Sequence, residues 1–392
     1  MAKRNANGDG SIYQRKDGRW CAAVTIGYDE NGKQKKKYIY DRDREQLRIK
    51  LLALQNDIVI NDGYVRDDII TLHQWGYTYL NDFIKPTVRP STYDLYELIL
   101  RKHICEDTIS KMKLKDIKAF HIQRFLNSKS SMSKSYLKKM YMLLDIFFVN
   151  AVRNDLIRKN PMESVNLPKS EKQIKEVRAL TREEQTAYMS NLDSTRLKPL
   201  LLTCLFTGMR LGELMALDWD HVNFKTGEIK VEYSYKEVRI HKKDKEPRWE
   251  MIKQPPKTSS GLRTIPIPAE IIKVLKAHKA SQDELSLKMG KNNFNTEGLV
   301  FCSEVGTPLS SRNIQRAHYS ICKKIGLTGI GFHALRHTFA TRMIEEGVEV
   351  KTVQYWIGHS SIEITYNIYV HVQEESKKAA AQVQSDLFKK LI

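Results

Sequence analysis

The spacing of apolar residues predicts a small β-sheet domain at the start of the chain. Apolar and polar positions alternate, with the period of a half-buried strand, over residues 10–15, 19–27 and 35–40. Asp17-Gly18 and Asn31-Gly32 separate these runs, and such dipeptides are typical of hairpin turns because both residues accept a positive φ with little strain. Between residues 41 and 60 leucine and isoleucine recur every three or four positions. We therefore expect a three-stranded sheet with one helix packed on it.

From residue 71 to residue 168 the apolar positions keep helical spacing. Single apolar stripes run along residues 91–104, 115–126 and 135–151. An amphipathic helix buries such a stripe against its neighbours, so these residues predict a compact bundle of four or five helices. Asn160-Pro161 and Leu167-Pro168 end the bundle, because proline disfavours helix in the residue before it.

The remainder of the chain predicts a linker and a mixed domain. Residues 169–178 are charged and carry few apolar side chains. Thr181 and Glu184 then form a capping box that opens a helix, and helix and strand patterns alternate beyond it. The fold class is multidomain: a sheet-plus-helix domain, an all-α bundle, and a mixed α+β domain that is mainly α. The expected boundaries are residues 1–62, 68–166, a linker at 167–178, and 179–392 with a C-terminal tail.

The net charge of the chain indicates what kind of partner it binds. The 392 residues include 65 Lys and Arg against 46 Asp and Glu, a net charge of +19. No apolar run approaches the roughly 18–20 residues that a membrane span needs, and residues 1–10 lack the apolar stretch of a secretory signal. The five cysteines are scattered without a C-x-x-C pair, which argues against a disulfide scaffold or a zinc finger. We expect a cytosolic protein whose partner is nucleic acid; a merely solubilising basic surface or an acidic membrane is the alternative.

Part of this charge lies near the predicted turns of the first sheet. The basic residues there are Arg15, Lys16, Arg19, Lys35, Lys36 and Lys37. They suit a sheet that lies on DNA, although a solvated basic face explains them nearly as well.

Two segments of the mixed domain place single cations where chemistry is possible. Arg210 lies in an apolar stretch, so it needs a partner, and Glu213 at i+3 can reach it on a helix. A purely structural Arg–Glu pair is the alternative. In residues 256–268, glycine and serine mark a hairpin, and Lys257 stands at the start of its turn. A flexible cation there can enter a groove; an ordinary surface lysine is the alternative.

A third segment combines histidine with arginine. Phe332, Leu335 and Phe339 make a core stripe at helical spacing. The neighbouring face carries His333, Arg336 and His337. Two histidines four residues apart also suggest a metal pair, but the glutamate of H-E-x-x-H is absent and Arg336 would repel a cation. A cluster rich in cations favours an anionic substrate.

A fourth segment lies near the end of the chain. Ser360 and Glu363 form a second capping box, which places His359 just before a helix. Tyr366 and Tyr369 lie on that helix. Periodicity does not choose between the two tyrosines, and a buried aromatic is the alternative for either.

Together these side chains suit phosphoryl transfer from a phosphodiester. Two guanidiniums can bind its non-bridging oxygens as charge develops. A tyrosine can attack the phosphorus if a histidine accepts its proton, since its pKa lies near 10. A mobile lysine can protonate the leaving 5′-oxygen.

From about residue 71 onward, the chain closely resembles the tyrosine recombinase (phage integrase) family. The resemblance rests on T-G-x-R-x-x-E, on the segment that runs from Lys257-Thr258 to Arg263, on H-x-L-R-H, and on Gly-His followed ten residues after the histidine by tyrosine. It implies catalytic roles for Arg210, Arg336, Lys257 (general acid), His333 (proton transfer at the nucleophile), His359 (phosphate contact) and Tyr369 (nucleophile), with Glu213 supporting Arg210. Tyr369-Val370-His371 matches the family's Tyr-x-His pattern, which favours Tyr369 over Tyr366.

The resemblance also implies a mechanism and partners. A 3′-phosphotyrosyl intermediate forms without ATP, metal or another cofactor, on double-stranded DNA with core and arm-type attachment sites. A homo-tetramer acts with accessory excision or DNA-bending proteins. The first domain looks like the arm-binding domain of integrases from temperate phages or integrative conjugative elements, and the bundle like a core-binding domain. Residues 372–392 carry an apolar stripe suited to packing on a neighbouring protomer, or on their own domain. A type IB topoisomerase and a non-catalytic DNA-binding repressor are the alternatives.

Overall fold

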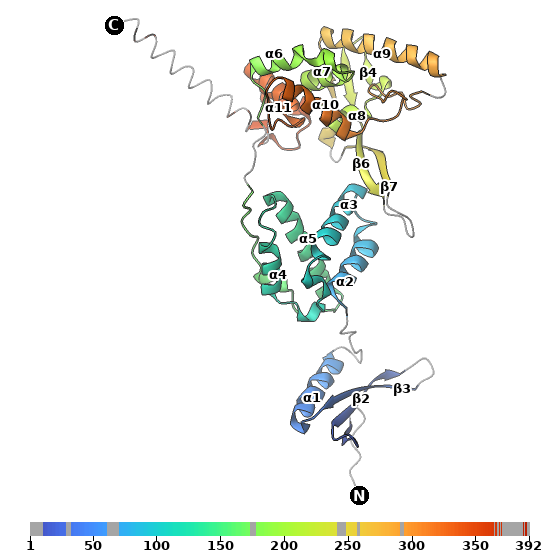
Figure 1. Cartoon of the computed structure of the whole chain (residues 1–392), viewed down its shortest axis with the longest axis vertical. Helices are drawn as coiled ribbons and strands as arrows, with labels where there is room; N and C mark the ends of the chain where they lie inside the picture. Colours follow the sequence, from blue (N-terminus) through green and yellow to red (C-terminus); the bar gives the residue numbers. More distant parts are fainter. Residues whose placement is uncertain are drawn as a thin grey trace. The chain divides into compact units, whose positions relative to one another are not determined.

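The structure is a computed structural model. It describes residues 11–28, 33–60, 70–172, 178–240, 248–256, 259–290 and 294–363, and beyond these residues 365, 366, 368, 370, 387 and 389. Contacts within the chain divide it into two compact units, residues 1–87 with 96–172 and residues 88–95 with 173–392 (Figure 1). All five cysteines are free thiols. Among the described residues no helix is both long and apolar enough to cross a membrane.

The N-terminal sheet has the predicted three strands. They are β1 (Ser11–Gln14), β2 (Trp20–Tyr28) and β3 (Gln34–Asp41), antiparallel in the order β1-β2-β3. Helix α1 (Arg44–Ile60) packs on one face through Leu47 and Leu51, which join Ala22 and Val24 in a small core (Figure 1). The spacing of apolar residues therefore predicted the sheet and the helix packed on it.

The helical region that follows has the predicted bundle character. Its α-helices are α2 (Leu72–Tyr79), α3 (Pro90–Ile99), α4 (Ala119–Asn127) and α5 (Lys134–Arg153). Trp75 on α2 is buried and donates its indole N–H to the carbonyl of Phe147 on α5, at 2.8 Å. The helix expected over 115–126 begins only at Ala119, because Ile117 and Lys118 are extended. The ring of His121 accepts the backbone N–H of Lys118 at 3.0 Å and fixes this late start.

The second unit is a mainly helical domain with two small sheets. Its helices are α6 (Arg182–Ser190), α7 (Lys198–Thr207), α8 (Leu211–Ala216), α9 (Ala269–Met289), α10 (Ser311–Lys324), α11 (His333–Glu345) and α12 (Val350–Ile357). The predicted capping box opens α6, because Thr181 Oγ1 accepts the N–H of Glu184 at 3.1 Å and Glu184 Oε2 accepts the N–H of Thr181 at 2.9 Å. One apolar core joins α7, α11 and the strand that contains Ile229. Leu201, Ile229 and Leu335 are fully buried in it.

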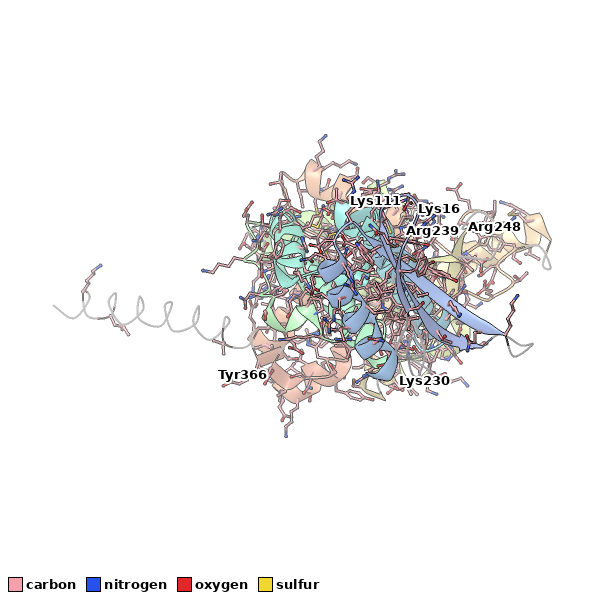
Figure 2. The ribbon with its side chains drawn as sticks, turned by 90° about the horizontal axis from the view of Figure 1, so that it is seen from below. Lys16, Lys111, Lys230, Arg239, Arg248 and Tyr366 are labelled. Carbon is pink, nitrogen blue, oxygen red and sulfur yellow. The ribbon has the colours of Figure 1, made fainter. Side chains whose placement is uncertain are left out.

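The strands of this unit correct one prediction. β4 (Val222–Asn223), β5 (Glu228–Val231) and β8 (Arg263–Pro266) form one sheet, and β6 (Ser234–Ile240) pairs with β7 (Arg248–Gln254) in a separate ribbon that carries Arg239 and Arg248 (Figure 2). The hairpin expected within residues 256–268 is wrong, since β7 and β8 belong to different sheets. Pro255 and Pro256 lack the N–H groups that would continue the β7 ladder, so the chain leaves the ribbon there.

Candidate active site

The site begins at the turn between α7 and α8. Gly208 ends α7 with φ +62°, a conformation that glycine adopts without strain, and Arg210 follows in extended backbone at the start of α8. Arg210 donates from Nη1 to Glu213 Oε1 at 2.8 Å and from Nη2 to the carbonyl of Gly358 at 2.5 Å. The predicted pair at i and i+3 is therefore present. The Arg210 side chain is 40% exposed whereas that of Glu213 is 5% exposed, so the guanidinium lies at the surface on a buried carboxylate.

Glu213 binds a second guanidinium that the sequence analysis did not select. Arg263, at the start of β8, donates from Nη1 to Glu213 Oε1 at 3.0 Å and from Nη2 to Oε2 at 2.7 Å. Burial alone would raise the pKa of the Glu213 carboxyl, but the hydrogen bonds and charges of Arg263 and Arg210 outweigh burial and hold that pKa below its usual range. A signal was present, because Arg263 shares the inward face of its strand with Ile265, and a buried arginine requires an acidic partner.

Arg336 is the second arginine of the cluster and is only 3% exposed. It lies in the first turn of α11 and donates from Nη1 to the carbonyl of Gly208 at 2.8 Å. Its buried Nε and Nη2 have no hydrogen-bond partner among the described residues. Burial, and next the charge of Arg210, lower the pKa of the Arg336 guanidinium. An anion placed against it would supply both the missing hydrogen bonds and the missing charge.

A cavity of about 260 Å³ adjoins Arg336. Its lining residues are Met209, Leu211, Gln315, Gly331, Phe332, His333 and Arg336. The cavity therefore brings together one predicted arginine and one predicted histidine, on α11, with the turn that carries Arg210.

Three histidines surround this cluster. His333 and His337 lie edge to face on α11 with their ring centroids 5.2 Å apart, and His359 shares a hydrogen bond of 3.0 Å between Nδ1 and Oγ1 of Thr365. Burial among protein atoms, and next the charge of Arg336, lower the pKa of His333 to about 4 and that of His359 to about 3. The same causes lower the pKa of His337. These imidazoles are therefore neutral at pH 7 and can accept protons.

The remaining predicted residues of this site lie outside the described part of the chain. Lys257 and Tyr369 are not described, nor is the tail beyond Val370 apart from Leu387 and Lys389. Tyr366 is described and is half exposed (Figure 2). The capping box predicted from Ser360 is wrong, because Oγ of Ser361 accepts the N–H of Glu363 at 3.2 Å. The helix starts one residue later than its sequence pattern suggested.

The predicted DNA-contacting residues belong to the N-terminal sheet. Arg15, Lys16 and Arg19 lie at the β1–β2 turn, where Asp17 pairs with Arg19 at 2.9 Å. Figure 2 labels Lys16. Lys35, Lys36 and Lys37 lie on β3, and the side chain of Lys35 is not described. The face opposite α1 also exposes Tyr13, Tyr38 and Tyr40, each between 44% and 48%. The guanidinium of Arg15 lies 5.3 Å from the Tyr40 ring centroid, so this outer face combines cations with aromatic rings.

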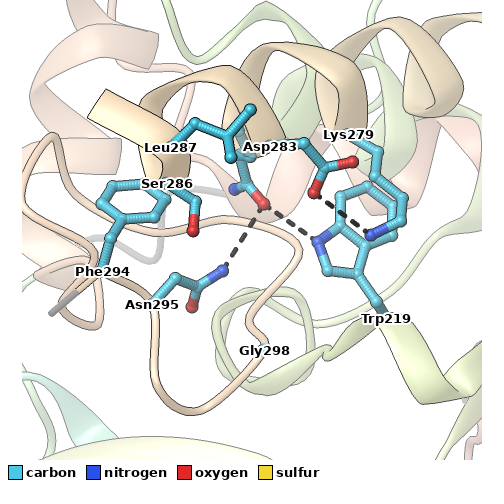
Figure 3. A pocket seen from close by; sticks show the side chains of 9 residues that line it. Trp219, Lys279, Asp283, Ser286, Leu287, Phe294, Asn295 and Gly298 are labelled. Carbon is cyan, nitrogen blue, oxygen red and sulfur yellow. Dashed lines mark hydrogen bonds and ion pairs between the residues drawn. The ribbon is translucent and has the colours of Figure 1, made fainter. Parts of the chain in front are cut away.

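A larger cavity, of about 490 Å³, lies elsewhere in the second unit (Figure 3). Trp219, Gln282 and Asn295 line it together with residues at the end of α9. The indole N–H of Trp219 donates to Gln282 Oε1 at 2.9 Å, and Gln282 Nε2 donates to the carbonyl of Val300 at 2.9 Å. These polar groups already bond to one another or to the backbone, so the polar lining of this cavity is explained by contacts within the protein. None of the predicted site residues lines it.

Comparisons with known proteins identify the family of the chain. The Phage integrase family matches residues 173–376, and the Phage integrase N-terminal SAM-like domain matches residues 71–130. A XerC-like tyrosine recombinase of Caldanaerobacter subterraneus is 34% identical over 99% of this chain and 100% of the relative. An integrase of Streptomyces ambofaciens is 26% identical over 100% and 99% of the two chains.

Solved structures share the fold. The Tn1549 transposon integrase bound to transposon right-end DNA has a TM-score of 0.64 at 21% identity and covers 81% of this chain and 100% of that one. A lambda integrase tetramer bound to a Holliday junction has a TM-score of 0.55 at 19% identity and covers 94% and 96%.

The chain therefore belongs to the phage integrase family. It is a tyrosine-type site-specific recombinase, an integrase that cleaves and rejoins DNA, which confirms the activity predicted from its motifs. This result favours a recombinase over the topoisomerase and the repressor.

The lowered histidine pKa values give a direct test. In a titration of ¹³C-labelled histidine side chains followed by NMR, with resonances assigned from His333→Asn and His359→Asn, both rings should stay neutral down to about pH 5 in the free protein. Added inorganic phosphate should raise both midpoints, because a nearby anion stabilises the protonated imidazole. Midpoints near the ordinary value of 6.5 that do not respond to phosphate would contradict the site.

Proposed function

We propose that this enzyme integrates and excises a mobile genetic element, and that the cluster of Arg210, Glu213 and Arg336 holds the scissile phosphate of its attachment site. Arg336 carries the proposal: it is a buried guanidinium, next to a cavity, whose Nε and Nη2 lack partners among the described residues. A phosphodiester is the anion that a recombinase of this family brings to such a site. Its two non-bridging oxygens match two guanidiniums that the protein holds in place beforehand.

The proposed chemistry is a transesterification. Oη of Tyr369 attacks the phosphorus while the bond from phosphorus to the 5′-oxygen breaks, which leaves a 3′-phosphotyrosyl linkage and a 5′-hydroxyl. Neutral His333 accepts the phenolic proton, Lys257 donates a proton to the leaving oxygen, and His359 contacts the phosphate. The 5′-hydroxyl of a partner strand reverses the step. Because the number of phosphodiester-type bonds is conserved, the exchange requires neither ATP nor a metal ion.

The proposed domains assign a task to each part of the chain. Residues 1–62 bind arm-type DNA and residues 68–166 bind the core site, followed by the linker 167–178 and the catalytic domain 179–392. The SAM-like match over 71–130 supports the core-binding assignment, and the division of the chain near residue 172 supports the boundary before the catalytic domain. The exposed tyrosines and lysines of the first sheet suit a nucleic-acid surface, since aromatic rings and cations both bind DNA.

The proposed partners follow from the solved relatives. The Tn1549 integrase was solved with transposon end DNA and lambda integrase as a tetramer on a Holliday junction. We infer that this chain also acts as a homo-tetramer on double-stranded DNA, with the tail packing between protomers, in the bacterial cytoplasm at the nucleoid. Accessory excision or DNA-bending proteins would set the direction of the reaction.

Replacing the proposed nucleophile tests the chemistry. On attachment-site DNA with a nick that lets the short cleaved strand diffuse away, the wild type should accumulate a covalent protein–DNA adduct, measured on a denaturing gel. Tyr369→Phe should form none, because it lacks the attacking oxygen. Tyr366→Phe is the matched control and should form the adduct at the wild-type rate. An undiminished adduct in Tyr369→Phe would refute the assignment.

Replacing a lysine on the outer face of the first sheet tests the arm-binding domain. Lys36→Ala should weaken binding to arm-type DNA and lower the salt dependence by about one counterion, as expected for one lost phosphate contact. Lys50→Ala is the control, because Lys50 lies on α1 and pairs with Asp41 at 2.6 Å. Binding measured by fluorescence anisotropy across a salt series should separate the two. If Lys36→Ala and Lys50→Ala changed DNA affinity equally, the basic residues of the first sheet would be a solvated face rather than a DNA-binding one.

A further inference from the structure

We propose that Arg263 is a positioning residue that sets Arg210 and His359 in place before DNA binds. This inference rests on the proposed function and names a residue outside the catalytic set. Arg263 reaches both parts of the site at once, through the Glu213 carboxylate and through main-chain carbonyls.

The first link runs through the carboxylate. Arg263 makes two parallel hydrogen bonds to Glu213, of 3.0 and 2.7 Å, and this bidentate geometry fixes the plane of the carboxylate. Each oxygen of Glu213 then accepts one further bond from Arg210, Oε1 from Nη1 and Oε2 from the backbone N–H, both at 2.8 Å. The position of Arg210 is therefore defined by a carboxylate whose own orientation Arg263 defines.

The second link runs through the backbone before His359. Arg263 Nε donates to the carbonyl of Trp356, in the last turn of α12, at 2.6 Å. Two residues later Gly358 turns the chain at φ +65°, and its carbonyl accepts Arg210 Nη2 at 2.5 Å. The contacts thus close a ring from Arg263 through Glu213, Arg210 and Gly358 back to Trp356. The ring is tight, since a Cβ at Gly358 would lie 3.0 Å from Arg263 Nη1.

The use of its donors separates Arg263 from the two phosphate-binding arginines. Its side chain is 0% exposed, and Nη1 also donates to the carbonyl of Gly261 at 3.2 Å, so Nε, Nη1 and Nη2 all have protein partners. Arg210 is 40% exposed, and Arg336 keeps two nitrogens without a partner among the described residues. Arg263 therefore has no nitrogen left for DNA and acts through other residues.

The test compares two arginine-to-lysine substitutions. Lysine cannot reproduce a planar fork, so Arg263→Lys should lose the bidentate bond and leave Arg210 free to shift. Arg342→Lys is the control: Arg342 is also mostly buried and binds Gln185, Glu345 and the carbonyl of Leu180, away from Glu213. At saturating DNA, Arg263→Lys should form the Tyr369 adduct roughly 100-fold more slowly, as expected for a displacement of about 1 Å, with DNA affinity unchanged. Arg342→Lys should react at the wild-type rate.

A second readout distinguishes positioning from a general structural defect. With a methylphosphonate at the scissile position, one charged non-bridging oxygen is replaced by a methyl group, so a displaced Arg210 matters less. The rate deficit of Arg263→Lys should therefore shrink. An equal deficit on both substrates would overturn the proposal, as would equal rates for Arg263→Lys and Arg342→Lys.

A double variant covers the case in which Arg263→Lys does not fold. Arg263→Met with Glu213→Gln removes both charges of the buried Arg263–Glu213 pair, so neither is left without its partner. With Glu213 already neutral, removal of Arg263 costs chiefly its bonds to the carbonyls of Trp356 and Gly261. This double variant should therefore react at most about tenfold more slowly than Glu213→Gln alone, against the roughly 100-fold loss in Arg263→Lys. A further large loss would contradict the proposal. If the wild type itself forms no adduct, the proposed function fails instead, so the two failures are distinguishable.

Discussion

The buried carboxylate of Glu213 is the constraint on which the site depends. It accepts two guanidiniums and one backbone N–H, from α8 and from β8, in a region with almost no solvent. A charge in such a place is stable only if every lone pair has a partner, and the carboxylate meets that condition with both oxygens. Glu213 neutralises only one of the two guanidiniums, so Arg210, Arg263 and Glu213 together keep a net positive charge. Arg210 is the more exposed of the two arginines and places that charge at the surface. The fold thereby presents a cation in one fixed position.

Arg336 supplies the complementary half of the arrangement. Its guanidinium is buried, Arg210 repels its charge, and two of its nitrogens have no hydrogen-bond partner among the described residues. Each of these destabilises the free protein, and a bound anion would offset all three. The histidines around it have lowered pKa values chiefly because they are buried, and next because the charge of Arg336 disfavours a further positive charge. In our proposal most of the net charge of +19 has a different task, which is to bind DNA through surface lysines and arginines with little regard to sequence. The proposed chemistry uses only a few groups, among them the half-exposed Arg210 and the buried Arg336.

Local rules predicted the parts of the molecule that depend on neighbours in sequence. Alternation predicted the first sheet, the Thr181 capping box predicted the start of α6, and i,i+3 spacing predicted the pair of Arg210 with Glu213. Long-range pairing was not accessible in this way. The partner of Glu213 lies fifty residues away, and the strand after residue 262 joins β5 rather than β7, because two prolines interrupt the expected hairpin. The assignments of Lys257 and Tyr369 rest on the family resemblance and on the proposed chemistry.

The most direct test of this account is an experimental structure of the enzyme bound to uncleaved attachment-site DNA. The account predicts that Arg210 and Arg336 contact the two non-bridging oxygens of one phosphate, at about 2.8 Å, with Nη2 or Nε of Arg336 now hydrogen-bonded. It also predicts that Arg263 keeps both bonds to Glu213 and does not touch DNA. A structure in which the two arginines contact different phosphates, or in which Arg336 Nε and Nη2 stay unbonded beside the scissile phosphate, would contradict it.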